Sequence, residues 1–294
     1  MSALHAGSSD GVVIAVHDLG GNGRDALVAH ATGFPLLAYL PLWRAVRSDA
    51  RLVGPDLRGT GGSTWPVSGR ADWQGFADDL ASALEATGLA DAAPLGIGHS
   101  SGATALLLLE ARRPGTFAAL WCFEPAYFPA GPDGHLSAVA EEILERRVAG
   151  ARRRRARFAT RAAARARLAA PLALRGEALE AYLDSAFVSG PDGLELVLRP
   201  EQEAAIYAGA PAAAAALDTA AVRCPVHLVS GELSEPASRS GAEELACRLP
   251  TVTREQIAGV AHLGPLTDPA AVAPSLRAWL AAAGEHPRRD TAGA

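Results

Sequence analysis

The sequence predicts an α/β protein whose central sheet is mostly parallel and is covered by helices on both faces. Two observations lead to this prediction. Short β-branched and apolar runs alternate with helical patterns over residues 12–125 and again over 221–283, as expected when parallel strands are joined by crossover helices. The chain also has 294 residues, 49% hydrophobic and 20% charged, which is enough to bury a sizeable core.

The elements follow from local pattern. The short apolar runs predict strands at 12–17, 26–30, 50–54, 94–98, 117–123, 225–230 and 253–257. Helical patterns lie at 41–47, 72–88, 103–113, 240–249 and 269–283, with Asp72 as the N-cap of the second. The first ten residues and the polar tail from Gly284 are expected to be mobile.

The alternation stops in the middle of the chain. Residues 126–220 are rich in Ala, Arg and Glu and read as mostly helical, with one weak strand signal at 194–198. The domain prediction is therefore a discontinuous core of 1–125 and 221–294 with a helical cap of 126–220. The cap should lie over the carboxyl ends of the strands, where such sheets bind ligands. The arginines at 152–155 belong to an arginine-rich helix at 146–167 that could contact an acidic substrate or partner. A solvated helix face paired with Glu141, Glu142 and Glu145 is the favoured interpretation.

Composition excludes several classes of function. The net charge of −5 does not favour nucleic acid or an anionic membrane as a partner. All 27 basic residues are arginines, so no lysine is present for a Schiff base, pyridoxal phosphate or a phosphate-binding P-loop. Three distant cysteines, the lack of a signal-like N-terminus and the lack of a long apolar run indicate a cytoplasmic protein without membrane spans.

One stretch carries the pattern of a nucleophile. Gly98-His-Ser-Ser-Gly102 follows an apolar strand and precedes an Ala/Leu helix. A nucleophile elbow needs small residues two positions before and two after its serine, because strand and helix pack closely there. Ser100 meets this spacing, whereas Ser101 has His99 and Ala103 at those positions. Glycines serving packing alone are the alternative interpretation.

A base for this serine is expected near the end of the chain. His262 follows the last predicted strand and precedes the last predicted helix. A loop in that place holds an imidazole over the carboxyl edge of the sheet, within reach of Ser100. A solvent-exposed loop histidine is the alternative. His99 adjoins the serine, so its side chain is expected to point elsewhere and either to pack in the core or to support the site residues.

These motifs together resemble the α/β-hydrolase fold family, in its lid-bearing, esterase-like form. The similarity rests on His30-Ala-Thr-Gly-Phe34, Asp56-Leu-Arg-Gly59, Gly98-His-Ser-Ser-Gly102 and His262, each after a predicted strand. It implies an oxyanion hole formed by the backbone amides of Phe34 and Ser101, with Thr32 or Gly33 as alternatives to Phe34. It also implies a structural role for the Asp56–Gly59 stretch.

The sequence offers several carboxylates as the third member of the triad. The family usually places the acid three residues past the glycine after the strand at 225–230, and here that position is Ser234. Glu232 and Glu235 flank it. A second arrangement in the family uses the end of the strand after the elbow helix, where Glu124 stands before a proline. A charge at that strand end needs a partner, and His262 is one. Glu124 is therefore the predicted acid and Glu232 the alternative.

The predicted function is cofactor-free hydrolysis of an ester, lactone, thioester or related acyl bond of a small molecule. Ser100, His262 and Glu124 would act as the triad and form an acyl-enzyme. Two alternatives are kept. The same site could serve C–C bond hydrolysis, acyl transfer or acid–base catalysis, or the cap could close on a ligand without catalysis. The predicted partner is a small-molecule substrate, with no nucleic acid, membrane or metal, and a homodimer is left open.

Overall fold

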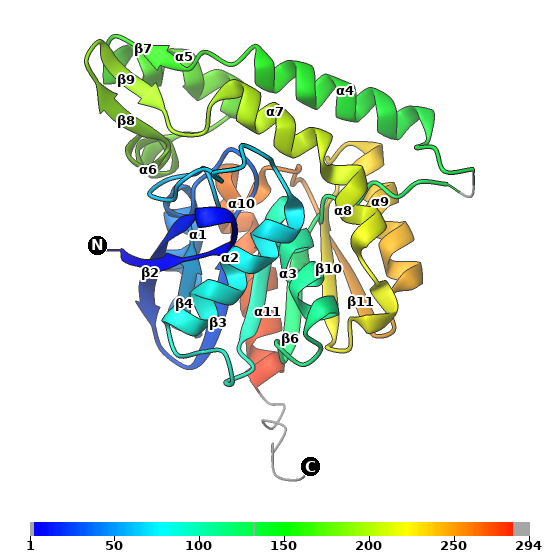
Figure 1. Cartoon of the computed structure of the whole chain (residues 1–294). Coiled ribbons are helices and arrows are strands. Elements are labelled where there is room, and N and C mark those ends of the chain that lie inside the picture. The colour runs from blue at the N-terminus through cyan, green and yellow to red at the C-terminus, as the bar shows by residue number, and fades with distance from the viewer. Residues whose placement is uncertain (1–2, 132, 285–294) are drawn as a thin grey trace.

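The computed structural model describes residues 3–131 and 133–284, with backbone only at 236–240 and at 284. A large sheet with helices on both faces forms the lower part of the molecule, and a separate layer of helices lies across its top (Figure 1). The predicted fold class, an α/β sandwich with a mostly parallel central sheet, is confirmed. No helix within the described ranges is long and apolar enough to cross a bilayer.

The central sheet has eight strands in the order β1-β2-β4-β3-β5-β6-β10-β11. Strand β2 pairs antiparallel with β1 and β4, and the remaining neighbours pair in parallel. The strands are β1 (Leu4–Gly7), β2 (Val13–Gly21), β3 (Arg24–Ala29), β4 (Ala50–Pro55), β5 (Leu95–His99), β6 (Ala119–Phe123), β10 (Val226–Gly231) and β11 (Val252–Ile257). All seven predicted strands of the core are present.

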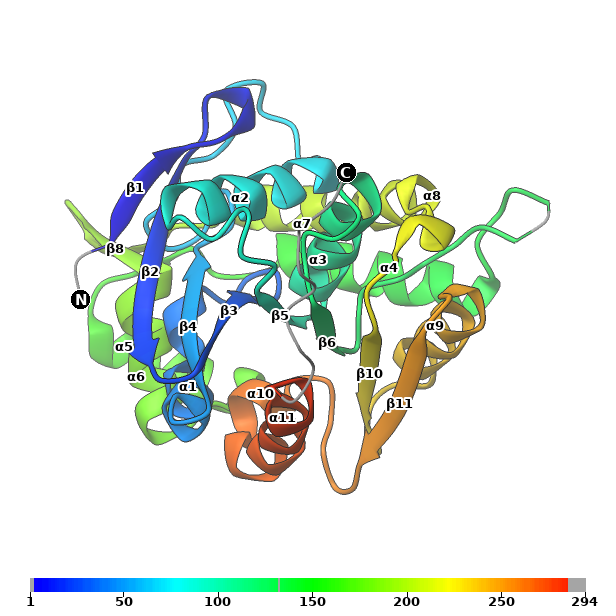
Figure 2. The ribbon, with the colours of Figure 1, turned by 90° about the horizontal axis from the view of Figure 1, so that it is seen from below.

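Helices of the core cover both faces of this sheet (Figure 2). They are α1 (Leu40–Val46), α2 (Trp73–Ala86), α3 (Ser101–Arg112), α9 (Pro236–Arg248), α10 (Gly264–Thr267) and α11 (Pro269–Gly284), with 3-10 turns η1 (Ser9–Gly11), η2 (Leu36–Tyr39) and η3 (Thr219–Ala221). Apolar residues of α2, α3 and α9 form one core cluster, and those of α1 and α11 form the other. Asp72 caps α2 as predicted, because its carboxylate accepts from the Gln74 amide at 3.0 Å.

The layer above the sheet contains helices and a small sheet. Its elements are α4 (Ala138–Arg152), β7 (Arg157–Phe158), α5 (Arg161–Leu172), α6 (Gly176–Ala186), β8 (Phe187–Gly190), β9 (Gly193–Leu196), α7 (Pro200–Ala208) and α8 (Ala210–Ala216). The strands form an antiparallel sheet in the order β7-β9-β8. The sequence predicted one strand between residues 126 and 220, whereas the described part of this region contains three. Pro191-Asp-Gly193 is a tight-turn signal between two apolar runs, and it indicates the β8–β9 hairpin.

The prediction of a mobile N-terminus is wrong for the residues that the structure describes there. Strand β1 pairs with β2 from Leu4 opposite Val16 to Gly7 opposite Val13. The following Ser8 donates to Asp79 at 2.6 Å. These partners lie far along the chain, so the local composition gave no sign of them. The predicted tail lies mainly at 285–294, outside the described residues.

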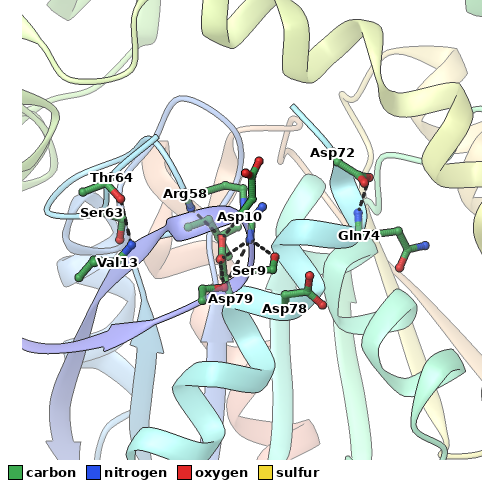
Figure 3. A network of polar contacts seen from close by, with 12 residues as sticks. Ser9, Asp10, Val13, Arg58, Ser63, Thr64, Asp72, Gln74, Asp78 and Asp79 are labelled. Carbon is green, nitrogen blue, oxygen red and sulfur yellow. Dashed lines mark hydrogen bonds and ion pairs between the residues drawn. The ribbon is translucent and has the colours of Figure 1, made fainter. Parts of the chain in front are cut away.

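The loop after β4 is held by buried ion pairs and hydrogen bonds. Asp56 accepts from the amides of Leu36 and Gly62, each at 3.0 Å, and contacts His17 at 2.9 Å. Arg58 makes a two-pronged contact with Asp79 at 3.0 and 2.8 Å (Figure 3). Both side chains of this second pair are at most 3% exposed. The structural role expected for the Asp56–Gly59 stretch agrees with these contacts.

Removing Asp79 should be strongly destabilising. An Asp79→Ala variant leaves the Arg58 guanidinium buried without its counter-ion, and such a change costs about 3–5 kcal/mol of unfolding free energy. Asp78→Ala is the matched control, since Asp78 pairs with Arg112 at a half-exposed site and should cost less than about 1 kcal/mol. Urea unfolding of the two variants measures the difference. Equal losses of unfolding free energy in the two variants would show that burial of the Arg58–Asp79 pair does not raise the cost of removing its carboxylate.

Candidate active site

Ser100 occupies a strained turn between β5 and α3. Its φ of 53° and ψ of −119° lie outside the ordinary regions for a residue with a side chain. The flanking glycines are required by close approach. A Cβ on Gly98 would lie 2.6 Å from Ala103 Cα, and one on Gly102 would lie 2.5 Å from the Ala29 carbonyl oxygen. The glycines therefore let strand and helix meet so closely that the serine is forced to the apex of the turn.

Backbone bonds fix this apex to the neighbouring strand β6. The Ser100 amide donates to the Phe123 carbonyl at 2.9 Å, and the Ala126 amide donates back to the Ser100 carbonyl at 3.3 Å. Strands β5 and β6 are paired in register up to His99 opposite Phe123. Ser100 and Glu124 therefore emerge side by side from the carboxyl edge of the sheet.

His262 and Glu124 form a direct pair. His262 Nδ1 lies 2.6 Å from Glu124 Oε2, and Glu124 Oε1 accepts from the Gly231 amide at 2.8 Å. The Glu124 side chain is fully buried, whereas that of His262 is 23% exposed. A carboxylate at Nδ1 requires that nitrogen to donate, which leaves Nε2 as the acceptor in a neutral imidazole. This is the tautomer that a general base needs.

The surroundings of Glu124 favour its charged form. Burial alone would raise its pKa, but the hydrogen bond and charge of His262 outweigh burial, and the hydrogen bond from the Gly231 amide contributes further. The pKa of Glu124 therefore lies below its ordinary value. Ser234, at the usual position of the acid in the family, is buried, and its hydroxyl has no hydrogen-bond partner within the described part of the chain.

The other candidate acids lie in different contacts. Glu232 accepts from the Gly259 amide at 2.8 Å, and so ties the turn after β10 to the loop that carries His262. Glu235 pairs with Arg146 of α4 at 2.7 Å. The structure thus brings Glu124 to His262 Nδ1, and the catalytic roles themselves remain predictions.

The loop at residues 30–34 lies next to the start of α3, where the oxyanion hole was predicted. Ser101 Oγ accepts from both the Thr32 amide, at 2.8 Å, and the Thr32 hydroxyl, at 2.9 Å. The Phe34 amide donates to the Ala31 carbonyl at 3.2 Å. The Ser101 amide is in the first turn of α3, whose N–H groups lack helical partners. Of the two predicted donors, Ser101 therefore has the freer amide.

Two supporting contacts were missed from the sequence. The Ser101 side chain holds the loop through Thr32, although only its backbone was assigned a task. Tyr39 links the same loop to His99, since its hydroxyl accepts from the Ala31 amide at 3.0 Å and contacts His99 Nδ1 at 2.8 Å. The His99 ring lies 5.0 Å from that of His262, centre to centre. The packing role expected of His99 is consistent with these contacts.

Residues of the cap lie against the loop at residues 30–34. A Cβ on Gly33 would lie 2.9 Å from Glu203 Oε1 and 3.2 Å from Arg154 Nη1. Arg154 pairs with Glu203 of α7 and donates to the Tyr182 hydroxyl of α6 at 2.6 Å. A small cavity of about 10 Å³ lies beside this pair, and its lining includes Gly33, Thr60, Arg154, Ala186, Leu196 and Leu198.

The arginine-rich stretch is therefore not a uniform solvated face. Arg154 is only 20% exposed, and Arg152 pairs with Glu201 of α7. Among the predicted acidic partners, Glu142 does lie 3.8 Å from Arg146. The expected pairing within α4 is thus largely replaced by pairing with α7. Helix α7 follows some 50 residues later, and its packing on α4 could not be read from local spacing.

Comparison with known proteins gives a clear result only for structures. No protein-family model matches the sequence, and no curated protein sequence matches it either. The chain is similar in fold to a thermophilic esterase from Thermogutta terrifontis, with a TM-score of 0.70, 21% identity, and coverage of 97% of this chain and 100% of the other. It is also similar to E-2-(acetamidomethylene)succinate hydrolase, with a TM-score of 0.74, 20% identity, and coverage of 95% and 99%.

A third similar structure is the peroxisomal α/β-hydrolase Lpx1 from Saccharomyces cerevisiae. Its TM-score is 0.71 at 16% identity, with coverage of 96% of this chain and 85% of the other. All three matches extend over the core and the cap together. At these identities the likeness is one of fold.

Proposed function

We propose that this chain, which has the α/β-hydrolase fold, is a serine hydrolase that cleaves an ester, lactone, thioester or related acyl bond of a small molecule. The observation that carries the proposal is the buried Glu124 at hydrogen-bond distance from His262 Nδ1, beside a serine held in a strained turn. Neither feature is needed for folding alone: a buried carboxylate is costly, and so is a positive φ at a serine.

In the proposed reaction Ser100 Oγ attacks the carbonyl carbon while His262 Nε2 takes its proton. Glu124 stabilises the resulting imidazolium and keeps Nδ1 as the donor. The developing oxyanion is held by the backbone amides of Ser101 and Phe34, as proposed from the motif. Collapse of the tetrahedral intermediate passes the proton to the leaving group, and the acyl-enzyme forms. Water activated by His262 then attacks the ester carbon and releases Ser100.

The neighbouring structures support this class of reaction, since those named above are described as an esterase and as hydrolases. Acyl transfer and C–C bond hydrolysis use the same group of residues, and they are distinguished by substrate. The serine in place of an acid at position 234 is the feature that favours ligand binding without catalysis. The pairing of Glu124 with His262 weighs against it.

A fluorophosphonate probe tests the proposal. We expect one equivalent to bond to Ser100, as found by peptide mass spectrometry, and short-chain 4-nitrophenyl esters to be hydrolysed with a loss of activity that parallels labelling. Prior denaturation of the protein is the control and should abolish labelling. An unlabelled Ser100 together with no hydrolysis across acetate to octanoate esters would count against a serine hydrolase.

A further inference from the structure

Arg147 differs from the other arginines of α4 in where its guanidinium lies. The side chain is half-buried, and its guanidinium carbon lies 5.7 Å from the centre of the Phe128 ring. Phe128 is itself buried and belongs to the segment that leaves β6 just after Glu124. Arg147 therefore points from the cap toward the carboxyl edge of the sheet, on the side where the predicted triad lies.

The charge of Arg147 reaches the neighbourhood of the nucleophile. Burial is the main reason that the pKa of His99 lies well below its ordinary value, and the charges of His262 and Arg147 lower it further. Burial and Glu203 raise the pKa of Tyr207 on α7, and Arg147 opposes that rise. The geometry points the same way: the Ala126 amide donates to the Ser100 carbonyl at 3.3 Å, and Phe128, which Arg147 contacts, follows two residues later.

This cation has no carboxylate within 4.0 Å among residues 3–131 and 133–284. Its neighbours on the same helix do have such partners: Arg146 pairs with Glu235 at 2.7 Å, and Arg152 pairs with Glu201 at 3.2 Å. Arg154, the other arginine near the site, is neutralised by Glu203. A partly buried guanidinium that lacks a counter-ion is unfavourable unless an anion binds to it.

We propose that Arg147 forms an anion subsite of the active site, and that the substrates of this chain are acyl compounds that carry a separate carboxylate. This inference rests on the proposed function and names its substrate class. Arg147 would bind the carboxylate with its fork of N–H donors. The Phe128 ring would bear on the flat face of the guanidinium and limit its orientations.

The arrangement of charges favours a carboxylate over a neutral or cationic group at this point. Glu203 is committed to Arg154 and lies over Gly33, and Glu124 is committed to His262. Neither of these two carboxylates is therefore available to neutralise the positive charge of Arg147. A carboxylate that entered beneath α4 would meet this cation while its acyl carbon faced Ser100.

The test compares a charged and a neutral ester of matched length, 4-nitrophenyl hydrogen adipate and 4-nitrophenyl hexanoate. We expect the wild type to prefer the adipate half ester. Arg147→Gln should lower the ratio of kcat/KM for adipate to kcat/KM for hexanoate by roughly tenfold or more, the size expected for loss of a charge-assisted hydrogen bond. Most of the change should be in KM for adipate. Arg146→Gln, the neighbouring exposed site, should leave the ratio unchanged.

A binding measurement separates this inference from the proposed function. Isothermal titration of adipate dianion should show binding to the wild type and to the Arg146→Gln variant, and roughly tenfold weaker binding to Arg147→Gln. That result would support the subsite even if Ser100 proved unreactive. Equal adipate affinity in wild type and Arg147→Gln, or an unchanged ester ratio, would overturn it. Matching thermal unfolding midpoints of the variants exclude a folding defect as the cause.

Discussion

Replacing Ser100 by alanine is expected to lower kcat on the best ester by roughly 10⁵- to 10⁶-fold, because it removes the group proposed to form the acyl-enzyme. The residual rate would come from binding and from the oxyanion donors alone. The thermal unfolding midpoint should be unchanged or slightly raised. Alanine has to adopt the same positive φ at this turn, but it buries no hydroxyl group. Steady-state kinetics and thermal unfolding of the same preparation measure the two effects.

Ser101→Ala is the matched control for this prediction. The two serines are adjacent, but Ser101 Oγ accepts hydrogen bonds from both the amide and the hydroxyl of Thr32. Its loss should loosen the loop at residues 30–34 while the backbone amide stays in place. We expect kcat to fall within about tenfold, the size expected from losing two neutral hydrogen bonds. A larger loss in Ser101→Ala than in Ser100→Ala would mean that the nucleophile has been assigned to the wrong serine.

Replacing Glu124 by glutamine should lower kcat by about 10⁴-fold, the effect of removing the charge that orients a catalytic histidine. The introduced amide can still contact His262, but it no longer stabilises an imidazolium, and its NH₂ group can turn toward Nδ1 and impose the wrong tautomer. The measurement is kcat on a neutral ester, made for the variant and the wild type at the same pH.

Two further variants sharpen the assignment of the acid. Glu232→Gln should change kcat by no more than about twofold, as expected for an exposed side chain away from the reacting atoms. Adding Ser234→Asp to Glu124→Gln should recover at least about tenfold of the lost rate, because an aspartate there can supply a carboxylate close to the Glu124 position. Near-wild-type activity in Glu124→Gln, with a large loss in Glu232→Gln, would transfer the role to Glu232.

The sequence predicted those parts of the molecule that depend on local pattern. Each core strand is a short apolar run, and the elbow at Ser100 is encoded within five residues, so both could be located without tertiary information. The proposal for Glu124 used one more physical step, the cost of leaving a charge at the end of a buried strand. Pairing with His262 was predicted to offset this cost.

Contacts between distant segments could not be predicted in this way. Strand β1 depends on its pairing with β2, and Tyr39 meets His99 across 60 residues. Arg154 and Arg146 belong to one arginine-rich stretch of similar composition, yet one lies inside the cap interface and the other on the surface. Which face of α4 is buried is decided by α7, and neither spacing nor composition within α4 contains that information.

The arrangement of the site along the chain has a consequence for when activity can first arise. The elbow, the loop at residues 30–34 and Glu124 all lie within the first 124 residues, whereas His262 comes from the loop before α10. The ribosome therefore releases the proposed nucleophile, oxyanion donors and acid long before the proposed base, His262, has been synthesised. Hydrolysis would begin only when the C-terminal segment docks, so the appearance of esterase activity during synthesis or refolding would report the final assembly step of the core.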